Sequence, residues 1–148
     1  MVIKKVTLIS LLLGILVLTA TVGHFLPPTG ILVIPLVIIL MTALIMLTDY
    51  DLPILTKSTI SYLFIGLNDI GIKLFAGGRH DSEGLGWIHM LLFIGLVPCF
   101  IILIIGVLRD GRSAVISKIL SVFIFALLIC IHLELFNTVG LGIHIKSR

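Results

Sequence analysis

The feature that most constrains the fold is a long run without charge near the N-terminus. From Val6 to Thr48 the chain contains no Asp, Glu, Lys or Arg, and only Pro27-Pro28-Thr29-Gly30 interrupts its apolar character. A helix of about 20 apolar residues crosses the hydrocarbon core of a bilayer. A water-soluble domain would have to bury the whole run, and 148 residues supply too little other surface to cover it. The run therefore predicts an integral membrane protein with spans at about 6–25 and 31–48, joined by a tight turn at the prolines.

The composition of the whole chain agrees with a membrane location. Hydrophobic residues make up 59% and charged residues 11%, and the mean hydropathy is +1.34. Soluble domains carry roughly 25% charged residues. The net charge of +3 does not indicate nucleic-acid binding, because no basic stripe interleaved with aromatic residues is present. We expect the basic residues to set orientation and to contact anionic lipid headgroups.

Two further spans are predicted in the second half of the chain, at about 85–108 and 114–136. The first lies between Glu83 and Arg109, has Trp87 near one end and contains Pro98, which predicts a kink. A short polar turn around Gly111 separates the two spans. The tail 137–148 alternates apolar and other residues, which favours an extended segment.

The segment 58–76 has the pattern of an amphipathic helix. Its apolar residues at helical spacing are Ile60, Leu63, Phe64, Leu67, Ile70 and Leu74, and its polar residues are Ser61, Asn68, Asp69 and Lys73. Placing Asp69 and Lys73 in hydrocarbon costs on the order of 5–7 kcal/mol, against roughly 3–5 kcal/mol gained from the apolar residues. The balance favours a helix at the membrane interface, or one that dips in with its polar face against protein. We expect Asn68 and Asp69 to face the cytoplasm; the alternative is a contact of Asp69 with Lys73 one turn on.

The predicted fold is therefore an all-α, polytopic membrane protein, a single bundle over residues 1–148. It has four transmembrane helices plus an interfacial amphipathic helix, and five spans are the alternative. With four spans the positive-inside rule puts the following residues in the cytoplasm: Lys4, Lys5, Lys57, Lys73, Arg79, Lys146 and Arg148. Five spans would bring Arg109, Arg112 and Lys118 to the cytoplasm and put His24 on the same side as His89.

Candidate functional residues gather around a polar turn and at one predicted depth in the bilayer. If the turn at Gly111 closes an antiparallel helix pair, His89 lies level with His132 and Glu134. Ionisable groups at membrane depth are candidates for function. The candidate cluster comprises Asp69, His80, Asp81, Glu83, His89, His132 and Glu134. We expect a direct or water-bridged hydrogen bond between His89 and Glu134.

Structural roles for these residues are favoured over a proton or metal site, and a proton or metal site over catalysis. His132 and Glu134 are two residues apart on a helix and point to different faces. No metalloprotease or phosphate-binding spacing is present. We therefore assign no catalytic residue, no metal and no cofactor. Cys99 and Cys130 are predicted to differ by roughly 10 Å in depth, which excludes a disulfide, and both are interpreted as buried packing residues.

The leading functional hypothesis is a non-enzymatic membrane component. It would be a homo-oligomer that anchors or signals to a soluble partner through residues 49–86, as in envelope sensing, anti-phage defence or toxin immunity. The second hypothesis is a small oligomeric channel or transporter lined by Asp69, His89, His132 or Glu134. A membrane-embedded metal-dependent enzyme is the third. The bacterial inner membrane, with both termini in the cytoplasm, is the expected location.

Overall fold

The computed structural model describes residues 5–49, 51–79 and 81–145 and is almost entirely helical. Its helices are α1 (Lys5–Phe25), α2 (Pro27–Leu32), α3 (Ile34–Leu47), α4 (Ile54–Phe75), α5 (Ser82–Arg109) and α6 (Val115–Leu135), and its strands are β1 (Gly78–Arg79) and β2 (His144–Ile145). The helices α1, α5 and α6 are long and apolar enough to cross a membrane, and α3 is a shorter apolar helix. The prediction of a polytopic helical membrane protein is confirmed.

The proline segment between the first two predicted spans is helical rather than a tight turn. Pro27 and Pro28 begin α2, and α3 likewise has Pro35 in its first turn. The fixed backbone angle of proline suits the first turn of a helix, where its missing amide donor leaves no hydrogen bond unmade. The chain reverses because Gly30 packs directly on Gly23 of α1, where a side chain at residue 30 would overlap that backbone.

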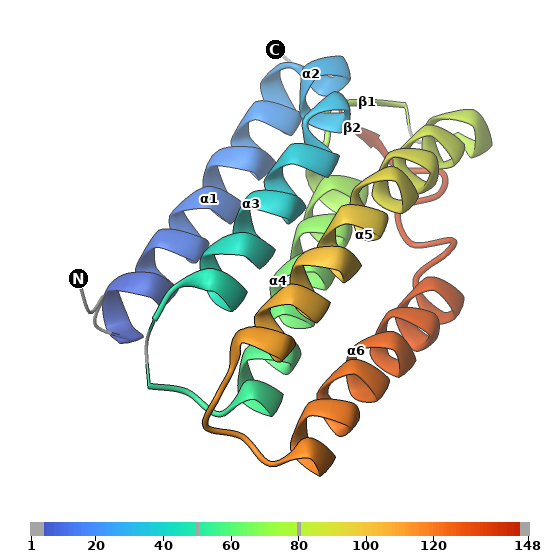
Figure 1. The fold of residues 1–148 in the computed structure, drawn as a ribbon. Coiled ribbons are helices and arrows are strands. Elements are labelled where there is room, and N and C mark those ends of the chain that lie inside the picture. The colour runs from blue at the N-terminus through green and yellow to red at the C-terminus, as the bar shows by residue number, and fades with distance from the viewer. Residues whose placement is uncertain (1–4, 50, 80, 146–148) are drawn as a thin grey trace.

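Helix α4 is the centre of the bundle. Figure 1 shows α1, α3 and α5 side by side with α4 running along them, and α6 at the edge of the bundle. α4 packs extensively on α1, α3 and α6 and less on α5, whereas α6 packs mainly on α4. The outer surface is apolar: Ile116 of α6, for example, is 78% exposed and Leu36 of α3 is 68% exposed. Such a surface matches a lipid environment.

The polar face of α4 lies inside the protein. The buried polar residues of this helix are Ser58, Ser61, Asn68, Asp69 and Lys73. The expectation that Asn68 and Asp69 face the cytoplasm is wrong, and the alternative contact of Asp69 with Lys73 is present. These polar residues are buried because neighbouring helices cover the polar face of α4, while Leu63 and Leu67 stay exposed. With 22 residues, α4 is about 33 Å long, close to the hydrocarbon thickness of about 30 Å.

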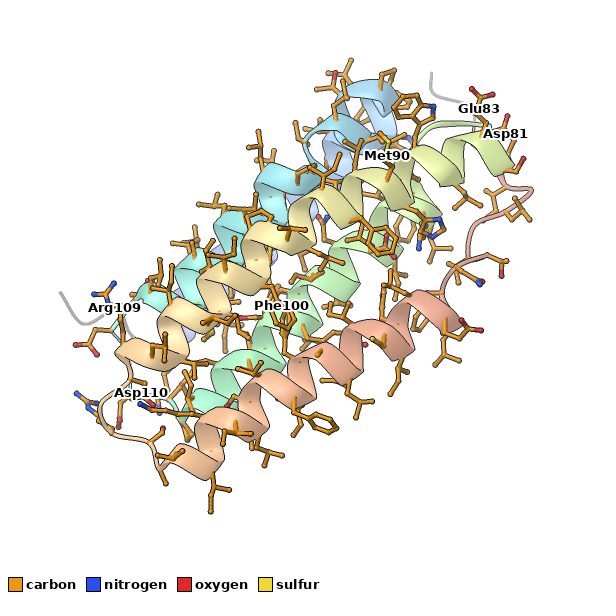
Figure 2. The ribbon with its side chains drawn as sticks, turned by 45° about the vertical axis from the view of Figure 1, so that its right-hand side comes forward. Asp81, Glu83, Met90, Phe100, Arg109 and Asp110 are labelled. Atoms are coloured by element: carbon orange, nitrogen blue, oxygen red, sulfur yellow. The ribbon has the colours of Figure 1, made fainter. Side chains whose placement is uncertain are left out.

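The two ends of the bundle differ in their charged groups. Lys5, Asp49 and Lys57 share a surface hollow with Asp110 and Arg112 at one end. A hydrogen bond from the Ser113 side chain is the main reason that the pKa of Asp110 lies below its ordinary value. Figure 2 shows Arg109 and Asp110 at this end of α5 and Asp81 and Glu83 at the other. We call the first the basic end.

The opposite end, which we call the strand end, ties α1, α4 and the C-terminal tail together. The amide of Gly77 donates to the carbonyl of Gly23 over 3.0 Å, and β1 pairs with β2 in antiparallel register. The start of α1 and strand β1 therefore lie at opposite ends of the bundle (Figure 1), and His24, near the end of α1, contacts the carbonyl of Phe75 at the end of α4. The five-span alternative predicts this placement, but α4 is not among the described helices that are long and apolar enough to cross a membrane. The tail was predicted to be extended; turns precede β2, with Gly140 and Gly142 at positive φ.

Candidate functional site

A buried cluster of charged side chains joins α4 to α6. Asp69 Oδ2 lies 2.7 Å from Lys73 Nζ and 2.9 Å from His132 Nε2. The side chains of Asp69 and Lys73 are fully buried, and that of His132 is 2% exposed. We call Asp69, Lys73 and His132 the charge cluster. Ionisable groups this deep in a membrane protein are costly, and they are candidates for function by default.

Helical spacing and a helix end bring the three groups together. Asp69 and Lys73 are one turn apart on α4, which places their side chains next to each other. Lys73 Nζ also donates a hydrogen bond over 3.0 Å to the carbonyl of Phe136, the residue that follows α6. The last carbonyls of a helix have no partner within the helix and attract cations. Lys73 thus neutralises Asp69 and stabilises the end of α6 at the same time.

A glycine lets α6 come close enough for these bonds. A side-chain carbon at Gly66 of α4 would lie 3.2 Å from His132 Nδ1. Aromatic rings surround the rest of the imidazole: the ring of Phe136 lies 4.9 Å and that of Tyr62 6.0 Å from it, centre to centre. Because an ionised carboxylate only accepts hydrogen bonds, His132 Nε2 carries a hydrogen in this contact. The ring is therefore held in one orientation.

The hydrogen-bonding capacity of the cluster is only partly used within the described residues. Asp69 Oδ1 is buried and has no hydrogen-bond partner, and the same holds for His89 Nε2 on α5. The side-chain polar atoms of Ser58, Ser61 and Asn68, elsewhere on the polar face of α4, are also buried and unpaired. Buried polar atoms usually have partners, and an unpaired one costs about 1–3 kcal/mol. A carboxylate oxygen and an imidazole nitrogen in this state are suited to binding and releasing protons.

Two predicted site residues, Asp69 and His132, belong to the charge cluster, and His89 lies near it. Lys73, Asp69 and His132 are the charged or titratable groups that act electrostatically on His89. The expected direct hydrogen bond between His89 and Glu134 is absent: Glu134 is exposed at the surface, and His89 Nε2 has no partner in the described residues. Of the two α6 residues predicted at the depth of His89, His132 points inward and Glu134 lies at the surface.

The polar turn before α5 has a structural role. Asp81 is the N-cap of α5, and its carboxylate accepts a hydrogen bond from the amide of Gly84 over 2.8 Å. Glu83 lies in the first helical turn, where a negative charge interacts favourably with the helix dipole. Both side chains are exposed. His80 lies outside the described residues.

Lys73 is a site residue outside the predicted cluster, because the positive-inside rule groups it with the cytoplasmic charges. A signal was present: an Asp and a Lys one turn apart neutralise each other, which lowers the cost of burying that face. Within residues 5–49, 51–79 and 81–145, no group of three or more His, Cys, Asp or Glu side chains could hold a metal ion. Cys99 and Cys130 are both free thiols; Cys99 is buried as predicted, but Cys130 is exposed.

Comparisons with known proteins do not assign this arrangement to a family. No family model matches the sequence, and no curated protein or solved structure is significantly similar to it. The charge cluster therefore has to be interpreted from its own chemistry.

Proposed function

We propose that the protein conducts protons across the membrane, with Asp69 as the central proton-binding group. The observation that supports this proposal is the state of the Asp69 carboxylate. One of its oxygens contacts Lys73 and His132, while the other is buried and unpaired. A purely structural ion pair gains most when all of its hydrogen-bonding capacity is used. A carboxylate with a spare oxygen that also contacts a histidine has instead the chemistry of a proton relay.

The charge balance of the cluster favours a proton over a metal cation. Asp69 and Lys73 together are neutral when both are ionised, so the carboxylate has no excess negative charge to attract a second cation. A metal ion would have to enter next to the Lys73 ammonium, which lies 2.7 Å from Asp69 Oδ2. A proton can enter at an imidazole nitrogen or at Asp69 Oδ1 without displacing that ammonium. The substrate of the proposed pathway is therefore the proton.

The proposal includes five crossings of the membrane. α4 lies among the other long helices and is long enough to cross. The basic end then carries Lys5, Lys57, Arg109, Arg112 and Lys118, and the positive-inside rule places it in the cytoplasm. The strand end, with β2, would face the opposite side, for which the bacterial inner membrane is our expected setting. The cytoplasmic C-terminus of the four-span hypothesis is replaced in this proposal.

The anchoring and signalling hypothesis has less support than proton conduction. It depended on residues 49–86 forming a polar surface outside the bilayer. Most of this stretch is α4, whose buried side chains include the polar residues Asn68, Asp69 and Lys73. A homo-oligomer is compatible with the proposal, since Ser10 and Gly14 of α1 are exposed. One chain nevertheless contains the whole charge cluster.

Proton flux into liposomes tests the proposal. Purified protein is reconstituted with a pH-sensitive dye inside, and a potassium gradient with valinomycin drives proton entry. We expect uptake by the wild type and its loss in Asp69→Asn, which keeps the shape of the side chain but removes its charge. The matched control is Glu134→Gln, a neutralised carboxylate on the surface of α6, which should conduct like the wild type. Both variants must elute as single species in detergent, and a well-folded wild type without flux would refute the proposal.

A further inference from the structure

His89 combines a buried nitrogen with a partly exposed ring. It lies two turns into α5 from the strand end, and its side chain is half-buried. Its Nε2 is buried and has no hydrogen-bond partner among the described residues. A histidine that only fills space would place this atom at a donor or at the surface, because an unpaired buried nitrogen costs about 1–3 kcal/mol. The ring thus connects the partly exposed flank of α5 with the interior.

The charged surroundings of His89 come from the charge cluster. The groups of the cluster whose charges act on His89 are Asp69 and Lys73 on α4 and His132 on α6. The other helices packed on α5 contribute nothing that titrates, since α3 has no ionisable side chain between Ile34 and Leu47 and α2 has none between Pro27 and Leu32. At the strand end, the N-cap residue Asp81 and Glu83 in the first turn of α5 are exposed and can exchange protons with water.

We propose that His89 is the group through which protons pass between the charge cluster and the water at the strand end. This inference rests on the proposed function, and it identifies the residue through which the proton pathway reaches the strand end. Imidazole suits this task because it can take a proton on one nitrogen and release one from the other. A protonated His89 gives its Nε2 hydrogen to Asp69 Oδ1 through an intervening water molecule, since the two atoms are not hydrogen-bonded to each other. His89 becomes neutral, Asp69 becomes a carboxylic acid, and the charge of the pair is unchanged.

The histidine relay predicts electrostatic coupling between His89 and Asp69, which can be measured without transport. Protein labelled with ¹⁵N-histidine in nanodiscs is titrated by NMR, and His24 serves as the matched control. His24 lies at the same end, but its Nδ1 hydrogen-bonds to the carbonyl of Phe75 over 3.2 Å, away from the cluster. In Asp69→Asn, we expect the His89 signals to change their response to pH, because the charge of the carboxylate no longer acts on the imidazole. The His24 signals should be the same in both proteins.

Flux measurements then test whether the coupled histidine carries protons. His89→Gln keeps a polar side chain but cannot titrate, and it should reduce proton uptake roughly 100-fold, the usual scale for loss of a proton-transfer group. Imidazole in the buffer should partly restore uptake in His89→Ala, while His24→Gln should conduct like the wild type. An unchanged His89 titration in Asp69→Asn, or full flux in His89→Gln, would overturn the relay. If the wild type showed no flux while its His89 still responded to the Asp69 substitution, proton conduction and the carrier role of His89 would both be refuted. Only an electrostatic coupling between His89 and Asp69 would remain.

Discussion

Two helix pairs in this bundle are held together in opposite ways. The contact between α3 and α5 is apolar and very close. A side-chain carbon at Gly95 of α5 would lie 2.8 Å from the Cα atom of Pro35, and one at Gly106 would lie 3.0 Å from Met46. The contact between α4 and α6 contains buried charged groups as well as apolar residues: Asp69 bonds to His132, and Lys73 bonds to the carbonyl of Phe136.

The difference between these pairs follows from the lipid solvent. Lipid chains are as apolar as leucine, so helices in a bilayer associate through close packing or through hydrogen bonds. The α3–α5 pair uses close packing, which does not depend on the charge of any group. The α4–α6 pair uses bonds that a single proton on Asp69 would weaken. We infer that α3 and α5 form the permanent frame and that α6 is the helix whose attachment responds to proton binding.

The largest effect is expected from filling the close contact between α3 and α5. Gly95→Leu would drive a side chain into the backbone at Pro35, which cannot move aside without separating the helices. Overpacking usually costs about 1–3 kcal/mol where side chains can adjust, and here we expect more, with loss of the folded protein. The measurement is recovery of a single species by size-exclusion chromatography in detergent. Gly86→Leu is the control, because nothing lies within 4 Å of a side-chain carbon on that residue of the same helix.

Breaking the α4–α6 pair from one side should have the next largest effect. Lys73→Met removes the partner of a fully buried carboxylate and the donor to the Phe136 carbonyl. Loss of one partner of a buried ion pair costs roughly 3–5 kcal/mol. The measurement is the midpoint of thermal unfolding in detergent, which should fall clearly below that of the wild type.

The double variant Asp69→Leu with Lys73→Met sharpens this result. Replacing both partners of a buried pair by apolar residues is often neutral for stability. We expect the double variant to recover most of the stability lost in Lys73→Met while remaining inactive in proton flux. A double variant as unstable as the single one would show that the charges are needed for the fold.

The position of a helix could be predicted from the sequence where the residues of that helix alone determine it. Uncharged runs such as Val6 to Thr48 fix where helices cross a membrane, and α5 and α6 begin and end within a few residues of the predicted spans. α4 could not be placed in this way. Burying Asp69 and Lys73 is unfavourable for an isolated helix, and the missing compensation comes from Phe136 and His132, more than 60 residues further along the chain.

The candidate site shows the same limit at the level of single residues. The hairpin register predicted one depth for His89, His132 and Glu134, because antiparallel helices keep a fixed register. It could not tell which of His132 and Glu134 faces inward. That choice depends on Gly66, whose missing side chain lets the ring of His132 approach α4. Periodicity within α6 alone carries no information about this contact.

A smaller effect is expected from narrowing the gap at Gly66. In Gly66→Ala the new methyl group would lie 3.2 Å from His132 Nδ1, so the ring has to shift by a few tenths of an ångström. We expect destabilisation of about 1 kcal/mol, as for modest overpacking, together with slower proton flux. The control is Gly71→Ala on the same helix, where a methyl group meets nothing within 4 Å. That variant should be slightly stabilised, because alanine favours a helix more than glycine does. Equal behaviour of the two variants would contradict the close approach of α6.

The smallest effect is expected from chemical labelling of the two native cysteines, which compares the α3–α5 and α4–α6 contacts directly. Cys99 lies fully buried on α5, close to Thr42 of α3, whereas Cys130 is exposed on α6. We expect a lipid-soluble maleimide to label Cys130 in the folded protein and to label Cys99 only after unfolding, with no change in stability. In Lys73→Met, below its unfolding temperature, Cys99 should stay protected, because the α3–α5 contact contains no bond to the charge cluster. Rapid labelling of Cys99 in that folded variant would mean that the α3–α5 contact depends on the α4–α6 contact. The contrast between a permanent and a proton-sensitive helix pair would then be wrong.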